Sequence, residues 1–269
     1  MVNVFVGGLA AFLYMLTGVL LAVRLAQSNS AKRLRNNRLL ALAGSAVVLH
    51  AWLLADTVLL PNGVNLGFFN ALSCTGWLIA TVLLLASLLS PIENLGIILF
   101  PYSALSVILA QVFSSERIIS SAEQWPLEAH IIISILAYSM LALATVQSLL
   151  LALQNRRLRQ RNVGGFIRAL PPLTTMESLL FQLIGIGFVL LSVALLSGFL
   201  FLEDIFTQRL VHKTILSIVA WFLFGILLWG RWRYGWRGPI AVRWTLGGFT
   251  VLMLAYFGSK LVLELILRR

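Results

Sequence analysis

Three histidines, His50, His130 and His212, are the side chains best suited to chemistry in this chain of 269 residues. Neutral imidazole binds metals and titrates near neutral pH, so each histidine is a candidate ligand or switch. His212 and the adjacent Lys213 stand directly ahead of a long apolar run, and His130 lies near the beginning of another. His50 lies within a third run. What these histidines can do therefore depends on the elements that the apolar runs form.

Composition places these elements in a membrane. Hydrophobic residues make up 60% of the chain and charged residues 11%, and the mean hydropathy is +0.96. This leaves too little polar surface to cover a water-soluble globule. A bilayer core requires roughly 20 apolar residues per helix. The runs have this length and lack the alternation of membrane β-strands, so they predict an all-α polytopic membrane protein.

We predict about eight transmembrane helices, forming a single transmembrane domain over residues 1–269. No Lys or Arg precedes the first run, which is too long for a signal peptide and is expected to remain as a helix. The expected spans are Val4 to Ala26, Leu39 to Leu60, Leu66 to Leu89, Leu95 to Phe113, Leu127 to Gln154, Leu179 to Leu202, Val211 to Gly230, and Val242 to Ile266.

Basic residues indicate how these helices cross the membrane. The first, fifth and seventh loops carry five, five and four Lys or Arg residues, whereas the even loops carry few. Because basic loops stay in the cytoplasm, we expect the odd loops inside and both termini outside. The net charge of +11 then reflects topology, so no nucleic-acid partner is expected. The basic residues of the odd loops are Arg24, Lys32, Arg33, Arg35, Arg38, Arg156, Arg157, Arg159, Arg161, Arg168, Arg231, Arg233, Arg237 and Arg243.

Two connections are longer than simple turns. Ser114 to Trp125 is polar and is a candidate for a short interfacial helix on the outer face. Arg156 to Ser178 alternates Arg with apolar residues, which is typical of an amphipathic segment that rests on anionic lipid headgroups. Both are also compatible with ordinary loops. Cys74 is the single cysteine, so the chain can form no internal disulfide.

The predicted topology places His130 and His212 at similar depth, because both lie near the outer beginning of a helix. Haem iron takes two axial ligands, and two histidines from different helices are a common way to supply them. A divalent metal would need further ligands, of which Glu128 and Asp204 are the nearest acids. The alternative is that both histidines are interfacial polar residues that hydrogen-bond to neighbouring helices.

His50 has a different environment, because a histidine in the middle of a bilayer needs a specific role or partner. Ligation, proton relay and a structural hydrogen bond are all compatible with its position, and Asp56 follows towards the outer face. The chain shows no Ser-His-Asp arrangement, phosphate loop or hydrolase-type carboxylate pair. We therefore do not expect an enzyme.

Three ordered segments resemble a known family of membrane proteins. The run AHIIISILAYSMLAL, from Ala129 to Leu143, carries a histidine, a tyrosine and a serine on a helix expected to enter from outside. The run HKTILSIVAWFLFGILLWGRW begins at His212 and has a tryptophan about eight residues after its lysine. The tail GWRGPIAVRWTLGGFTVLMLAYFGSK forms the last turn and helix. Together they resemble the cytochrome c assembly family of CcsA-like proteins.

The resemblance implies an eight-helix, haem-handling protein of the bacterial inner membrane. His130 matches an outer-face haem ligand of the family, and His50 matches a histidine within the membrane. His212 stands beside the lysine of the family pattern, where the family has proline, and is our candidate for the second outer ligand.

The chain also departs from the family pattern. Family members that present haem carry a tryptophan-rich outer segment, whereas GFLFLEDIFTQRLVHK contains no tryptophan. Trp229 stands where the family has a second histidine within the membrane. Two hypotheses follow: a protein that binds or handles haem, and a scaffold or regulatory subunit that keeps the fold without haem and contacts a membrane-protein partner. A transporter that uses His50 and Asp56 is a third possibility.

Overall fold

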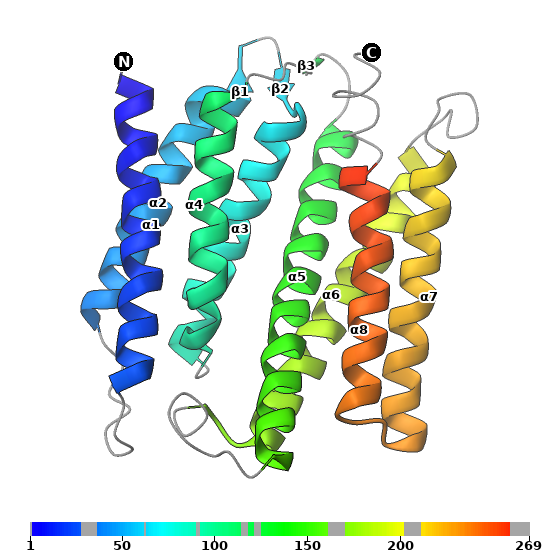
Figure 1. Cartoon of the computed structure of the whole chain (residues 1–269). Coiled ribbons are helices and arrows are strands. Elements are labelled where there is room, and N and C mark those ends of the chain that lie inside the picture. The colour runs from blue at the N-terminus through cyan, green and yellow to red at the C-terminus, as the bar shows by residue number, and fades with distance from the viewer. Residues whose placement is uncertain are drawn as a thin grey trace. The chain divides into compact units, whose positions relative to one another are not determined.

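The computed structural model describes residues 2–27, 37–61, 63–89, 92–113, 118–120, 125–160, 170–201 and 211–258. Within these ranges, eight helices are long and apolar enough to cross a membrane, which confirms the predicted polytopic helical architecture. The chain divides into two compact units (Figure 1). The N-terminal unit contains residues 1–122 and 157–172, and the C-terminal unit contains residues 123–156 and 173–269. The single domain expected from the sequence stays a prediction.

Four helices form the N-terminal unit: α1 (Val2–Gln27), α2 (Asn37–Val58), α3 (Phe68–Leu89) and α4 (Gly96–Val112), the last preceded by the 3-10 turn η1 (Glu93–Leu95). α1 packs against α2 and α4, and α3 packs against the same two helices. Small residues allow these close contacts. A Cβ atom on Gly76 of α3, for example, would lie 2.2 Å from Ser106 Oγ of α4.

A small antiparallel sheet joins two connections of the N-terminal unit at one end (Figure 1). Strand β2 (Gly63–Asn65) pairs with β1 (Leu59–Leu60) on one side and with β3 (Ile118–Ser120) on the other. The pairing confirms that the second and fourth loops lie at the same end of the unit. Two predictions are corrected: α2 ends at Val58 rather than Leu60, and residues 118–120 of the 114–125 connection, expected as an interfacial helix or an ordinary loop, form strand β3. Ile118 and Ile119 are β-branched and pair with an available strand edge, which favours the strand.

Four further helices form the C-terminal unit: α5 (Trp125–Arg159, in this unit up to Arg156), α6 (Leu173–Phe201), α7 (Val211–Tyr234) and α8 (Pro239–Met253). A π-helical turn, η3 (Leu254–Gly258), continues α8. α7 packs against α6 and α8. The Tyr138 ring of α5 lies 5.1 Å from the Phe249 ring of α8.

Several helices differ in length from the predicted spans. α5 continues beyond Gln154 to Arg159, and α6 begins at Leu173 rather than Leu179. The segment predicted to rest on headgroups is therefore partly helical at both ends, and residues 161–169 lie outside the described part of the chain. α6 starts directly after Pro171 and Pro172, a sequence that favours a helix start. The final span, predicted to reach Ile266, is described only as far as Gly258.

The turn between α7 and α8 is fixed by an acid from α6. Glu177 Oε1 accepts a hydrogen bond of 2.9 Å from the backbone N–H of Gly238, and Glu177 Oε2 lies 3.6 Å from Arg237 Nε. Gly238 has a φ angle of +51°, which side chains with a Cβ rarely adopt. Glu177 is 8% exposed, and this bond ties the second turn of α6 to the beginning of α8.

Candidate functional site

His50 lies in the core of the N-terminal unit, where the structure gives both ring nitrogens a hydroxyl neighbour. Its side chain is 0% exposed. Nε2 lies 2.8 Å from Ser73 Oγ on α3, and Nδ1 lies 3.4 Å from the Tyr14 hydroxyl on α1. A buried imidazole needs such partners, because an unpaired polar group in an apolar core is costly. The three side chains connect α1, α2 and α3.

Asp56 belongs to a separate network near the sheet end of the same unit. Its carboxylate accepts a hydrogen bond from the Asn3 side chain of α1. The carbonyl oxygen of Asn3 in turn accepts a bond of 2.7 Å from Gln111 Nε2 of α4. His50 and Asp56 therefore have different partners, so the described contacts do not join them into one path.

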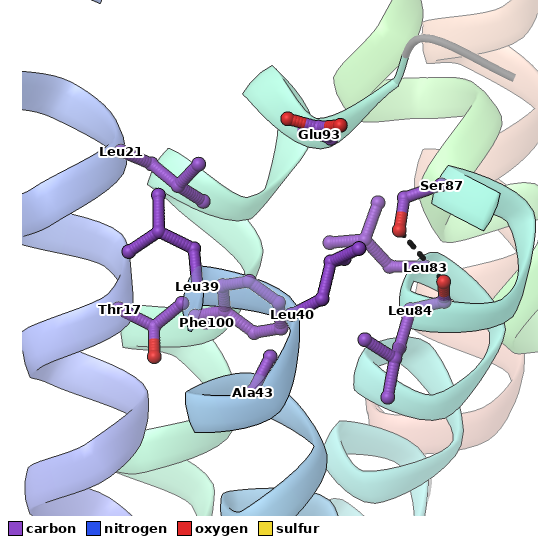
Figure 2. Close-up of a pocket in the computed structure, with 10 residues that line it drawn as sticks. All are labelled: Thr17, Leu21, Leu39, Leu40, Ala43, Leu83, Leu84, Ser87, Glu93 and Phe100. Carbon is purple, nitrogen blue, oxygen red and sulfur yellow. Dashed lines mark hydrogen bonds between the residues drawn. The ribbon is translucent and has the colours of Figure 1, made fainter. Parts of the chain in front are cut away.

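The N-terminal unit has a small pocket between the helices, towards the end opposite the sheet (Figure 2). Its walls are mainly aliphatic, and Glu93 lies among its lining residues. The polar groups here already have partners: Ser87 Oγ donates to the Leu84 carbonyl at 2.7 Å, and Glu93 lies 3.8 Å from Arg24. The lining contains no histidine; it consists of Thr17, Leu21, Leu39, Leu40, Ala43, Leu83, Leu84, Ser87, Glu93 and Phe100.

His130 lies in the C-terminal unit, in the second turn of α5, and is partly buried. Its Nδ1 atom lies 2.8 Å from Ser197 Oγ, near the end of α6. The Ser197 hydroxyl donates to the carbonyl of Ala194 in its own helix, at 3.0 Å. The imidazole thus contacts α6 at Ser197 through Nδ1, and it also has a hydrogen bond with the backbone of Ala194.

His212 is the second residue of α7, and its side chain lies outside what the structure describes. Because α5, α6 and α7 run in alternating directions within the unit, the beginnings of α5 and α7 lie at the end where α6 finishes (Figure 1). His130 and His212 therefore occupy the same end of the C-terminal unit, as the topology predicts. That the two imidazoles bind the same haem iron stays a prediction.

Two hydroxyl partners of these histidines, Tyr14 and Ser197, were missed by sequence reasoning. Each lies in an apolar helix that contains other hydroxyl residues, and no spacing distinguishes them. Among the residues that the structure describes, no group of three or more His, Cys, Asp or Glu side chains could hold a metal ion. The Glu128 side chain and Asp204, the acids considered for a divalent metal, lie outside that part of the chain.

Comparison with known proteins decides the family. Residues 39–267 match the family described as "Cytochrome C assembly protein". The chain belongs to this family. It is also 32% identical, over 231 residues, to the inner membrane protein YpjD of Escherichia coli K12, an alignment that covers 84% of this chain and 85% of the relative. The resemblance seen in the sequence is thus confirmed, and YpjD is the branch that it indicates.

More distant relatives are named cytochrome c biogenesis proteins. The chain is 23% identical over 201 residues to the cytochrome c biogenesis protein CcsA of Chlamydomonas reinhardtii, covering 73% of this chain and 54% of that protein. It is 26% identical over 90 residues to CcsA of Synechocystis, covering 33% of this chain and 27% of that protein. No solved structure matches. With its eight candidate spans and its YpjD relative, this family member is a multi-pass inner-membrane protein.

Proposed function

We propose that this protein binds haem at the end of the C-terminal unit where α5 and α7 begin, with His130 as an axial ligand. The observation that supports this most directly is the environment of His130. Its Nδ1 atom contacts Ser197 Oγ at 2.8 Å, and the ring also has a hydrogen bond with the backbone of Ala194 on the same helix. Histidines that ligate a metal commonly hold their second nitrogen in a hydrogen bond of this kind. The donor set therefore fits a haem iron.

His212 is the candidate for the second axial ligand. It lies at the same end of the unit as His130 and on a different helix, so the two histidines could together hold a haem iron. When bound, haem would supply a redox-active iron whose potential depends on its axial ligands. The contribution of the chain would be to hold the iron through imidazole nitrogens and to surround the macrocycle with apolar helix surface.

His50 supports the fold of the N-terminal unit in this proposal. Ligation of iron by either of its nitrogens would displace a hydroxyl neighbour, Ser73 from Nε2 or Tyr14 from Nδ1. The proposed protein is a haem-binding accessory factor in cytochrome c assembly that turns over no small substrate. Its partners are membrane lipids and a membrane protein that supplies or receives haem.

Haem titration of the purified protein tests this assignment. The wild-type chain is expected to bind haem and to give the spectrum of a six-coordinate, low-spin iron. His212→Ala is expected to retain haem with a five-coordinate, high-spin spectrum, because His130, which is held by Ser197, remains as a ligand. His130→Ala is expected to lose most of the haem, and His50→Gln to keep it.

The alternative is a scaffold or regulatory subunit that keeps the family fold without haem. The observation that favours it is the absence of tryptophan between Gly198 and Lys213. Equal haem binding by the wild type, His130→Ala and His212→Ala would refute the proposed site. Purification of a colourless protein with a stoichiometric partner, and no binding of added haem, would support the scaffold.

A further inference from the structure

A serine on α6, Ser197, contacts the His130 ring at Nδ1. Ser197 Oγ donates its hydrogen to the Ala194 carbonyl, at 3.0 Å. A hydroxyl has one hydrogen to donate but can still accept through its oxygen. With the Ser197 hydrogen directed at the Ala194 carbonyl, the contact of 2.8 Å with His130 Nδ1 takes Nδ1–H as the donor and Ser197 Oγ as the acceptor.

A second serine on the same helix supports this direction. Ser192 Oγ donates to the Phe188 carbonyl at 2.8 Å and accepts a bond of 2.8 Å from Trp221 Nε1 of α7. An indole N–H can only donate, so the direction of that bond is unambiguous. Ser192 therefore donates to its own helix and accepts an N–H from a neighbouring helix. The Ser197 contacts have the same arrangement, with the Ala194 carbonyl as acceptor and the His130 ring as the neighbouring group.

The consequence for His130 is a defined tautomer. With the proton on Nδ1, the neutral imidazole carries its lone pair on Nε2, the atom that a metal would bind. The same bond limits rotation of the ring, because Ser197 Oγ is itself held by the backbone of α6. We propose that Ser197 is a positioning residue, which holds His130 in the Nδ1–H tautomer and presents Nε2 as the haem-iron ligand.

This inference rests on the proposed function for the role of Nε2, but the tautomer itself does not depend on haem. A hydrogen-bonded partner of a metal-binding histidine typically changes metal affinity by about 10-fold to 100-fold when it is removed. Ser197→Ala is therefore expected to weaken haem binding by at least about 10-fold. Ser197→Thr keeps the hydroxyl and is expected to bind haem with the affinity of the wild type.

Nitrogen-15 NMR of histidine-labelled full-length protein, without haem, reads the tautomer directly. The His130 signals, identified by their loss in His130→Gln, are expected to show a protonated Nδ1 and an unprotonated Nε2 in the wild type. Ser197→Ala is expected to shift this population towards Nε2–H. Ser192→Ala, the matched control, removes an equivalent interhelical bond and is expected to leave His130 unchanged.

Two results would overturn the inference: a wild-type His130 protonated mainly at Nε2, or a tautomer and haem affinity that are the same in Ser197→Ala as in the wild type. Equal haem binding by the wild type and His130→Ala is a different result. It would refute the proposed function and the ligand role of Nε2, and the NMR comparison would still decide whether Ser197 sets the tautomer.

Discussion

At the scale of single residues, the two described histidines use their ring nitrogens differently. His50 has hydroxyl neighbours at both nitrogens, from Tyr14 and Ser73, in a core position that is 0% exposed. His130 contacts Ser197 through Nδ1. A ligand role requires a nitrogen with an available lone pair, and a structural role requires that both nitrogens are satisfied. The contacts therefore favour a structural role for His50 and a ligand role for His130.

The first prediction concerns His50. Ser73→Ala removes the closer of its two partners and is expected to lower the free energy of unfolding by about 0.6 to 2 kcal/mol, the range for hydrogen bonds between membrane helices. Thermal unfolding in detergent measures the loss. Thr75→Ala is the control, because in the described part of the chain the Thr75 hydroxyl bonds within its own helix, to the Ala71 carbonyl. A large loss of haem in Ser73→Ala with unchanged stability would instead support a cofactor role for His50.

At the scale of secondary-structure elements, the packing of α5 against α6 determines where His130 and Ser197 meet. Gly187 of α6 is the close contact: a Cβ atom there would lie 2.7 Å from both Cγ and Cδ2 of Leu141 on α5. Gly185 lies two residues earlier on the same helix, and no heavy atom of the described residues lies within 4 Å of the position that its Cβ would take. The two glycines therefore form a matched pair for testing helix packing.

The second prediction follows from this pair. Gly187→Ala is expected to destabilise the protein by about 1–3 kcal/mol, the usual effect of overpacking, and to weaken haem binding by shifting α6 along α5. Gly185→Ala is expected to be neutral or slightly stabilising, because alanine favours a helix over glycine. Thermal unfolding and haem titration of both variants measure these effects. Equal melting temperatures and equal haem affinities of the two variants would contradict the close packing of Gly187 against Leu141.

The third prediction concerns the tie between α6 and α8. Glu177→Gln keeps an oxygen that can accept from the Gly238 N–H, whereas Glu177→Ala removes it. The ion pair with Arg237 contributes little, because the Arg237 side chain is 65% exposed and such pairs are screened by solvent. Glu177→Ala is therefore expected to lower the melting temperature clearly more than Glu177→Gln. Equal losses would show that the charge, rather than the hydrogen bond, stabilises the turn.

At the scale of the whole molecule, hydropathy predicts the helices well. A membrane requires long apolar segments whose backbone N–H and C=O groups form hydrogen bonds within the segment. Hydropathy does not predict where the helices stop: α5 continues through Asn155 and Arg156 because these residues are compatible with a helix outside the lipid. The three-stranded sheet was missed because strands of two or three residues leave no periodic signal. Ser197 could not be predicted, since its contact with His130 arises only when α5 and α6 pack.

The fourth prediction concerns orientation in the membrane. The basic odd loops predict that the sheet end of the N-terminal unit faces outwards. In a Cys74→Ser background, Asn62→Cys is expected to react with a membrane-impermeant thiol reagent in intact cells. Asn162→Cys, in the fifth loop, is expected to react only after the membrane is permeabilised. The reverse pattern of labelling would invert the topology and place the His130 end of the C-terminal unit inside.

The absorbance spectrum of the detergent-purified protein, oxidised and then reduced, tests the central claim most directly. The wild-type chain is predicted to show a Soret band that shifts on reduction, and His130→Ala, purified in parallel, is predicted to lose most of that band. A wild-type protein that shows no Soret band, even after incubation with haem, would contradict the assignment. So would a His130→Ala variant with an unchanged band.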